Sequence, residues 1–247
     1  MIDDKVLDAN RRALDNVQGW VGDQIHHIVD FAGKLHKEYS ISGAIAEVGI
    51  HHGALFFILI SIATGNEKCL AMDIFDDQHL NVDKSGKGSL ATFEGHLANV
   101  FPEKRNSVDI WKVDSMSLSP TDLRERLSGQ RVRLFSVDGG HTVAHVINDL
   151  NIAQDNLTPF GIVALDDFFG YHWPSVTEGY FRYMEFHNRR LAPFLIFQNK
   201  LFLTTFSEHE IVLKKYREYI DILFGEELHH KWKYSMLSGF KVIAKDK

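Results

Sequence analysis

Residues 134–141 read LFSVDGGH and residues 161–168 read GIVALDDF, and both runs pass from apolar residues directly into aspartate. Apolar runs of this length are typical of strands that are buried on both faces of a parallel sheet. The segment between them, residues 142–157, carries apolar side chains at helical spacing along one face. We therefore expect a strand–helix–strand unit. Three aspartates follow its strands: Asp138, Asp166 and Asp167.

The composition is that of a globular enzyme, with 247 residues, 45% of them hydrophobic and 24% charged. A net charge of −6 argues against a nucleic-acid-binding protein, which would need a basic surface. The chain has no apolar run of the length needed for a membrane span, and its acidic start is unlike a secretory signal. Its one cysteine, Cys69, is expected to be a buried core residue. We expect a cytoplasmic enzyme.

Predicted helices and strands alternate along the rest of the chain. Residues 3–40 read as one amphipathic helix that covers the main domain. Strands are expected at 44–50, within 68–75 (ending at Asp73) and at 107–115, one or two more within 191–206, and a last one at 239–246. The alternation predicts an α/β fold with a doubly wound, mostly parallel sheet. We expect one domain over 1–247, in which 1–40 form a helical N-terminal extension and 44–247 form the catalytic core.

Every predicted strand from the first to the fifth ends in an acidic residue. In doubly wound sheets ligands bind at the carboxyl ends of the strands, and neighbouring strand ends are only about 5 Å apart. Carboxylates at that spacing repel one another by about 1 kcal/mol in water and by more when partly buried. Protonation, hydroxyl groups or cations must offset this repulsion, so a nucleoside with a cationic tail fits better than a pyrophosphate. The acids are Glu47, Asp73, Asp114, Asp138, Asp166 and Asp167.

A glycine-containing turn, residues 47–53 (EVGIHHG), joins the first strand to the next helix. Glycines allow a tight turn and a close approach of a ligand to the backbone. His51 and His52 occupy the middle of the turn, so it differs from the GxGxxG dinucleotide fingerprint. We expect these histidines to line a cofactor pocket, although a plain strand–helix turn accounts for the pattern as well.

The chain resembles the class I S-adenosylmethionine-dependent methyltransferases, and within them the macrocin O-methyltransferase-like branch of sugar O-methyltransferases. The resemblance rests on ExGxxxG at 47–53, Asp73, the DS pair at 114–115 and the pairing of VDGGH with GIVALDDF. It covers the chain from about residue 44 onward. It implies a seven-stranded, Rossmann-like methyltransferase fold that binds S-adenosylmethionine.

The resemblance also implies roles for individual residues. The backbone at Gly49 and Gly53 would approach the amino-acid end of the cofactor, with Glu47 and His52 nearby. Asp73 would accept hydrogen bonds from the ribose hydroxyls. The remaining expected cofactor residues are Asp114 and Ser115, which would flank the adenine, and Asp138.

In metal-dependent members of this branch, aspartates that match Asp138, Asp166 and Asp167 hold a divalent cation, usually Mg²⁺. Ligation by oxygen atoms alone suits that ion. The cation would lower the pKa of a substrate hydroxyl and orient it toward the methyl group. The alternative is that Asp166 and Asp167 only end a strand or cap a helix.

The sequence differs from this branch at the position of a candidate catalytic base. Those enzymes often carry DGD, whose second aspartate is a candidate base, but the corresponding residue here is Gly140. We therefore expect His141, with Asp138 beside it, to be catalytic, because an imidazole has a pKa suited to proton transfer. In the structural alternative, His141 merely opens the following helix.

The expected reaction is methyl transfer from S-adenosylmethionine to a hydroxyl group of a small molecule, such as a sugar or another natural product, with Mg²⁺. Two alternatives stay open: another metal-dependent enzyme on this fold, or a non-catalytic S-adenosylmethionine-binding module. The acidic loop at 76–92 either closes over the substrate or is solvated surface, and the aromatic segment 171–173 is either a substrate wall or packing. Neither nucleic acid nor a membrane is an expected partner, and a homo-oligomer stays open.

Overall fold

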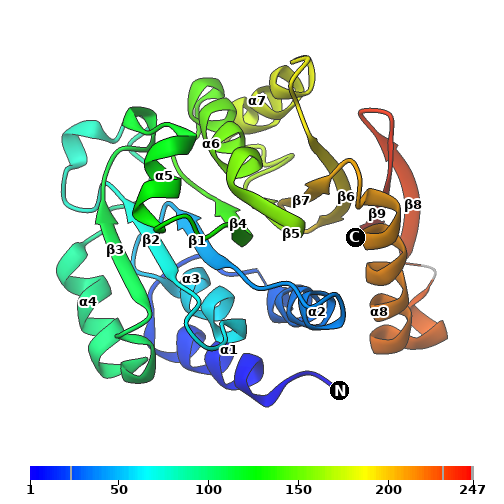
Figure 1. The fold of residues 1–247 in the computed structure, drawn as a ribbon, viewed down its shortest axis with the longest axis horizontal. Helices are drawn as coiled ribbons and strands as arrows, with labels where there is room; N and C mark the ends of the chain where they lie inside the picture. The colour runs from blue at the N-terminus through cyan, green and yellow to red at the C-terminus, as the bar shows by residue number, and fades with distance from the viewer. Residues whose placement is uncertain (23, 230, 246–247) are drawn as a thin grey trace.

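The computed structural model describes residues 1–22, 24–229 and 231–245. Over these residues, nine strands form one sheet in the order β3-β2-β1-β4-β5-β7-β6-β9-β8 (Figure 1). The strands are β1 (Ala44–Val48), β2 (Cys69–Asp73), β3 (Val108–Lys112), β4 (Val132–Val137), β5 (Leu157–Leu165), β6 (Leu191–Phe197), β7 (Lys200–Thr205), β8 (Trp232–Leu237) and β9 (Phe240–Lys245).

Helices cover both faces of the sheet (Figure 1). The face covered by α1 (Asp4–Asn16), α2 (Ile25–Glu38), α3 (Ala54–Leu59), α4 (Leu90–Asn99) and α8 (His209–His229) holds one apolar cluster. The opposite face is covered by α5 (Pro120–Arg126), α6 (Val143–Asn156) and α7 (Pro174–Met184). Successive strand residues alternate between the clusters, as Ile45 and Ala46 do, which explains the unbroken apolar runs.

The strand–helix–strand unit at 134–168 is confirmed. β4 and β5 pair in parallel, and α6 crosses between them with Thr142 as its N-cap. β1 pairs in parallel with both β2 and β4, so the strand order reverses between β1 and β4. A ligand crevice is expected at such a reversal, next to the strand ends that carry the acids.

The expectation of seven strands was too low. Residues 191–205 form two antiparallel strands, and β8 pairs with β9 to extend the sheet past β6. Nothing in the sequence predicted β8, because four consecutive residues at 233–236 are exposed and the strand lacks an alternating apolar pattern. The expectation of a mostly parallel sheet is confirmed by the pairings from β3 through β5.

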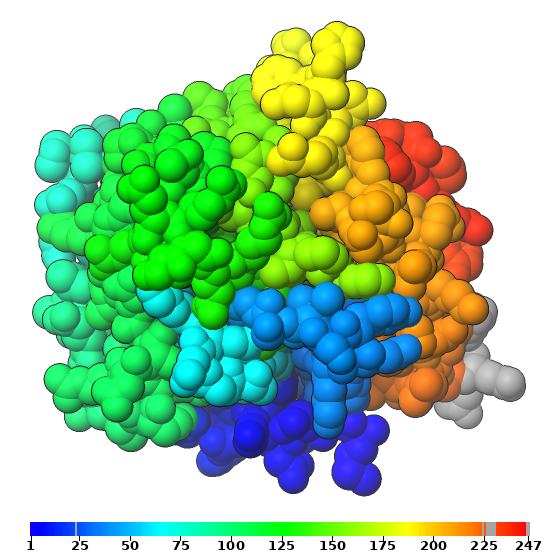
Figure 2. Space-filling model, viewed as in Figure 1, coloured from blue at the N-terminus to red at the C-terminus, as the bar shows by residue number. Residues whose placement is uncertain are grey.

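The N-terminal cover is two helices rather than the single helix expected for 3–40. The chain leaves helical conformation after Asn16 and passes over the start of α3, where a Cβ on Gly19 would lie 2.7 Å from the Ala54 Cβ. α2 lies directly against α8 (Figure 2), and the Lys215 ammonium is 2.6 Å from the Glu38 carboxylate. Within the described residues, no helix is both long and apolar enough to cross a membrane.

Candidate functional site

A cavity of about 520 Å³ opens at the carboxyl ends of β1 to β5. All six acids expected at the strand ends line it. The shared edge of parallel strands explains this, because it brings residues distant in sequence to one place. Gly49, Ser115 and His141 line the cavity as well.

The turn after β1 depends on Gly49. Its φ is +88°, and a Cβ at this position would lie 1.7 Å from the Asp138 carbonyl oxygen. Only glycine therefore allows the ends of β1 and β4 to pass this closely. This contact sets Glu47 and Asp138 side by side at the edge of the sheet.

Two residues of the same turn lie away from the cavity. Neither His52 nor Gly53 is among the described residues that line it. The His52 carbonyl oxygen is 3.1 Å from Nδ1 of His96. A Cβ on Gly53, at a φ of +95°, would lie 2.7–2.8 Å from the rings of Phe57 and Phe93. The structure thus gives Gly53 a packing role, whereas a cofactor contact was expected.

Glu47 is buried at the end of β1. Its Oε1 accepts a 2.9 Å hydrogen bond from Ser136, while Oε2 has no hydrogen-bond partner among the described residues. Burial raises the pKa of Glu47 to about 8. An unpaired buried carboxylate oxygen facing a cavity is suited to accept from a cationic ligand.

The ends of β2 and β3 provide the second group of acids. The Asp73 carboxylate accepts a 2.7 Å hydrogen bond from the His51 backbone N–H, and burial raises its pKa. Asp114 accepts a 2.9 Å hydrogen bond from the Met116 N–H, and Ser115 next to it is buried. Asp73, Asp114 and Ser115 thus line the wall on the β2–β3 side.

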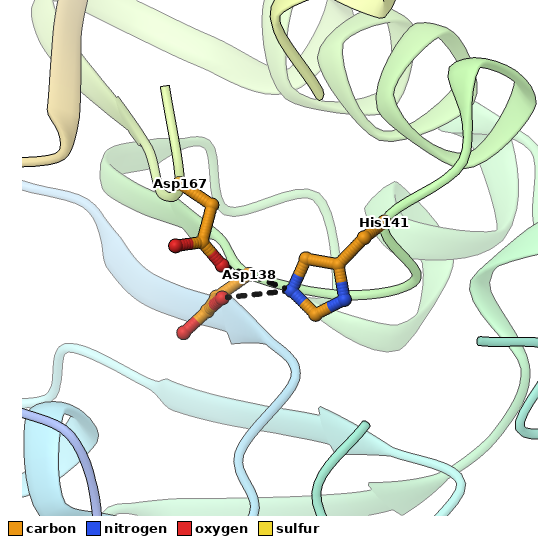
Figure 3. A group of neighbouring side chains, drawn as sticks. All are labelled: Asp138, His141 and Asp167. Carbon is orange, nitrogen blue, oxygen red and sulfur yellow. Dashed lines mark ion pairs between the residues drawn. The ribbon is translucent and has the colours of Figure 1, made fainter. Parts of the chain in front are cut away.

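Asp138, His141 and Asp167 form a compact cluster (Figure 3). One ligand atom of each lies within 4.8 Å of the others. The His141 Nε2 is 3.1 Å from Oδ2 of Asp167 and 4.0 Å from Oδ1 of Asp138. The two carboxylates follow β4 and β5, and the imidazole precedes α6, so the opening unit of the sequence supplies all three.

Asp166 lines the same cavity but has a different partner from Asp167. Its carboxylate pairs with the ammonium group of Lys200, the first residue of β7, whose exposed fraction is 2%. Asp167 has a positive φ of 54°, and its Oδ1 accepts a 3.1 Å hydrogen bond from Asn199. The backbone turn between the two aspartates sends their side chains to different partners. All three expected metal ligands line the cavity: Asp138 and Asp167 lie with His141, and Asp166, which is paired with Lys200, also lies beside Asp138, whose pKa is raised by burial and by the Asp166 carboxylate.

His141 is held on three sides. The Asp83 Oδ2 is 2.8 Å from both the backbone N and the ring Nδ1 of His141, and the Trp173 ring stacks on the imidazole at 4.3 Å. A carboxylate can only accept, so Nδ1–H donates to Asp83, and Nε2 can donate to Asp167 when the ring is protonated. Burial lowers the pKa of His141, but the hydrogen bonds with Asp167 and Asp83 outweigh it and raise the pKa.

Three residues of the site were not predicted. Lys200 and Asn199 come from the hairpin between β6 and β7, and Trp20 comes from the segment between α1 and α2. Lys200 stands at the head of an apolar run, LFL, and a lysine there is normally a surface residue. Trp20 lies within residues 3–40, which the sequence predicted as one helix. None of these three positions carried a local signal for the cavity.

A further buried carboxyl, Asp149 of α6, lies behind Ser115 and Gly139, and burial raises its pKa to about 7. An unfolded aspartate ionises near pH 4, so between about pH 4 and 7 the unfolded state releases a proton that the folded state keeps. We expect stability to fall across this range by roughly 1.4 kcal/mol per pH unit from this group. In Asp149→Asn, urea unfolding between pH 4 and 8 should lack this component. Parallel curves for the two proteins would contradict the assignment.

Comparisons with known proteins match part of this chain to a methyltransferase domain and its fold to solved methyltransferase structures. Residues 46–168 match a family model described as a methyltransferase domain. No curated protein sequence matches the chain. Among solved structures, the apo form of CalS11, a TDP-rhamnose 3'-O-methyltransferase of calicheamicin biosynthesis, is 13% identical, with a TM-score of 0.50 over 81% of this chain and 92% of that chain.

Two other similar structures contain S-adenosylhomocysteine. The Podospora anserina methyltransferase PaMTH1 is 11% identical, with a TM-score of 0.53 over 83% of this chain and 88% of that chain. MycE of the mycinamycin pathway, solved with Mg and S-adenosylhomocysteine, is 13% identical, with a TM-score of 0.52 over 81% of this chain and 54% of that chain. At these identities the likeness shows the fold.

Proposed function

We propose that this chain, in which residues 46–168 match a methyltransferase domain, is a class I S-adenosylmethionine-dependent methyltransferase that transfers the methyl group to a hydroxyl oxygen of a small molecule, assisted by a divalent cation. One observation carries the proposal. The acids suited to a cofactor, Glu47 and Asp73, line the same cavity as the Asp138–His141–Asp167 cluster. A methyl donor and a proton acceptor would thereby meet at one place.

The cofactor half of the cavity suits S-adenosylmethionine by its chemistry. The unpaired Oε2 of Glu47 would accept from the ammonium group at the amino-acid end. Asp73 would accept from the ribose hydroxyls, and Asp114 and Ser115 would lie beside the base. The O-methyltransferase CalS11 and the S-adenosylhomocysteine-bound neighbours support this assignment.

A divalent cation fits the second half of the cavity. Asp138 and Asp167 provide carboxylate oxygens, the donors that Mg²⁺ prefers, and Asp166 lies next in the chain. MycE, which was solved with Mg, supports a cation here. When bound, the cation would lower the pKa of an acceptor hydroxyl. Asp138 and Asp167 would hold it, with Asp166, which lines the same cavity beside Asp138, as a further oxygen donor.

The chain's own base in this reaction is His141. The acceptor oxygen attacks the methyl carbon, the carbon–sulfur bond breaks, and S-adenosylhomocysteine leaves. The hydroxyl proton would pass to Nε2 of the neutral His141 ring, whose Nδ1–H donates to Asp83, and the protonated ring would then be held by Asp83 and Asp167. The raised pKa of His141 makes it a stronger base. Trp173, stacked on the ring, restricts its rotation.

Calorimetry with S-adenosylhomocysteine tests the proposal most directly. We expect binding, and tighter binding or a separate heat when Mg²⁺ is present. Protein that does not bind S-adenosylhomocysteine would refute methyl transfer. Binding and turnover that are unchanged by EDTA would refute the cation while leaving the methyltransferase in place. Binding without turnover on any hydroxylated acceptor would favour a non-catalytic module.

Asp83 is expected to be a positioning residue for His141. In Asp83→Asn the carboxylate that fixes Nδ1–H is lost, so kcat should fall by about tenfold or more while the KM for S-adenosylmethionine changes little. The nitrogen chemical shifts of the His141 ring report directly which nitrogen carries the proton. Asp77→Asn is the control, because Asp77 belongs to the same loop but pairs with Lys112. Equal effects of the two substitutions would contradict this role.

A further inference from the structure

The sheet ends in β8, which is its outermost strand on the side away from β3 (Figure 1). β8 and β9 form a hairpin whose turn consists of Ser238 and Gly239, with φ of 50° and 84°. These angles are typical of a two-residue hairpin turn. In such a turn the flanking residues, here Leu237 and Phe240, exchange both of their backbone hydrogen bonds.

The backbone of Tyr234 and Met236 faces away from β9. In an antiparallel pair, residues that exchange hydrogen bonds alternate with residues whose N–H and C=O groups point outward. Counting back from Leu237, the outward residues of β8 are Met236, Tyr234 and Trp232. The Trp232 carbonyl oxygen accepts a 2.8 Å hydrogen bond from Arg217, in agreement with this count. Within the described residues, the outward groups of Tyr234 and Met236 have no partner, and these residues are 47% and 65% exposed.

The opposite edge of the sheet is closed by a side chain. Arg126 of α5 lies along β3, donates a 3.1 Å hydrogen bond to the Ile110 carbonyl oxygen and pairs with Asp109. A side chain in this position occupies a backbone group that another strand would need. The two edges therefore differ, because the described part of the chain leaves β8 open at Tyr234 and Met236.

The open edge carries positive charge, although the whole chain has a net charge of −6. Residues 231–245 contain four lysines and no aspartate or glutamate. All four are exposed: Lys231, Lys233, Lys241 and Lys245. The Lys241 ammonium lies 4.4 Å from the centre of the Tyr234 ring, next to the open backbone groups. Lys231, Lys241 and Lys245 form no ion pair with another described residue, so their charge is available to a partner.

We propose that the β8 edge binds an acidic, extended segment of a partner protein, which adds to the sheet as a further strand. The N–H and C=O groups of Tyr234 and Met236 would pair with the backbone of the segment, and the lysines would pair with its carboxylates. A second copy of this chain is disfavoured, because two β8 edges side by side would bring two sets of lysines together. Nucleic acid would satisfy the charge but has no peptide backbone to continue the sheet.

The β8 edge is separate from the cavity, because none of residues 231–245 is among the described residues that line it. Binding at the edge is therefore expected to leave the affinity for S-adenosylhomocysteine unchanged. Calorimetry with and without a bound peptide would measure this. The two sites can thus be tested independently, and loss of one leaves the other in place.

Fluorescence anisotropy of labelled probes with the full chain tests the proposal. The probes are a short peptide of alternating glutamate and valine, its lysine–valine counterpart, a glutamate–proline peptide of the same charge, and a short oligothymidylate. We expect the glutamate–valine peptide to bind more tightly than each of the others by about tenfold or more, since proline cannot pair as a strand. Absence of measurable binding would overturn the proposal, as would equal binding of the proline peptide or tighter binding of oligothymidylate.

Variants connect binding to the edge. Met236→Pro removes an outward N–H but no bond to β9, so it should weaken binding of the glutamate–valine peptide by about tenfold or more. Lys233→Glu/Lys241→Glu reverses charge at the edge and should weaken binding by a similar factor. Lys5→Glu/Lys37→Glu, at exposed lysines of α1 and α2, should have no effect. Equal effects of the two double variants would overturn the proposal.

Two further measurements keep the test decisive. Circular dichroism and urea unfolding show whether each variant keeps its fold, and the exposed lysine variants decide the outcome if Met236→Pro unfolds. Sedimentation velocity measures self-association. A dimer that forms with increasing concentration and is lost in Met236→Pro or in Lys233→Glu/Lys241→Glu would show that a second copy occupies the edge, and it would overturn the proposal.

Discussion

Replacing His141 by alanine is expected to lower kcat by about 10²- to 10⁴-fold, the usual contribution of a positioned general base. Nε2 of His141 lies 3.1 Å from Asp167 and 4.0 Å from Asp138, and Gly140 offers no carboxylate in its place. The KM for S-adenosylmethionine should change little, because the cofactor acids Glu47 and Asp73 are untouched. Steady-state kinetics with a fixed hydroxylated acceptor would measure both quantities.

A control is needed because His141 also holds the loop after β2. His79 lies in that loop, is exposed and is not among the described lining residues, so His79→Ala should retain wild-type kcat. Urea unfolding of both variants would show whether the loss in His141→Ala reflects unfolding. A His141→Ala enzyme with wild-type turnover would remove this residue from the mechanism and leave deprotonation to the cation.

Replacing Lys200 by methionine is expected to reduce the free energy of unfolding by about 3–5 kcal/mol, because it leaves the buried Asp166 carboxylate without its partner. The double variant Lys200→Met/Asp166→Asn should recover most of this loss, since neither member of the pair then carries a buried charge. Urea unfolding at pH 7, with equal slopes for all variants, would provide the comparison.

An exposed ion pair provides the control. Lys112 pairs with Asp77 at 2.8 Å, and both side chains are about one-third exposed or more. Lys112→Met should therefore cost no more than about 1 kcal/mol. If Lys200→Met proved as mild as Lys112→Met, then the pair with Asp166 would contribute little, and Asp166 would be free to serve as a cation ligand.

The parts of the fold that the sequence predicted are those in which burial leaves a local pattern. β4 and β5 are buried on both faces, so they appear as apolar runs, and α6 between them shows the spacing of one apolar face. β8 leaves no such pattern, because its middle residues are exposed. The break between α1 and α2 was missed because the contact of Gly19 with Ala54 is made by distant residues.

The residues of the site also divide into those that a local pattern predicted and those whose place depends on contacts with distant residues. The acids at strand ends could be predicted because parallel strands bring their carboxyl ends to one edge of the sheet. His52 and Gly53 were expected to contact the cofactor because of their place in the motif, yet His52 lies by His96 and Gly53 packs against Phe57 and Phe93. Residue type and spacing do not report side-chain direction within a turn.

The sequence by itself determined the doubly wound arrangement, the acidic edge of the sheet and the resemblance to methyltransferases, because strand burial and strand-end position are properties of short segments. Only the tertiary structure decided how the three aspartates of the opening unit are used. Asp138 and Asp167 lie with His141, and Asp166, beside Asp138, pairs with Lys200, a residue from another strand. The physical reason is that a carboxylate's partner is set by backbone direction and by side chains that arrive from elsewhere in the chain, as Lys200 and Asp83 do here.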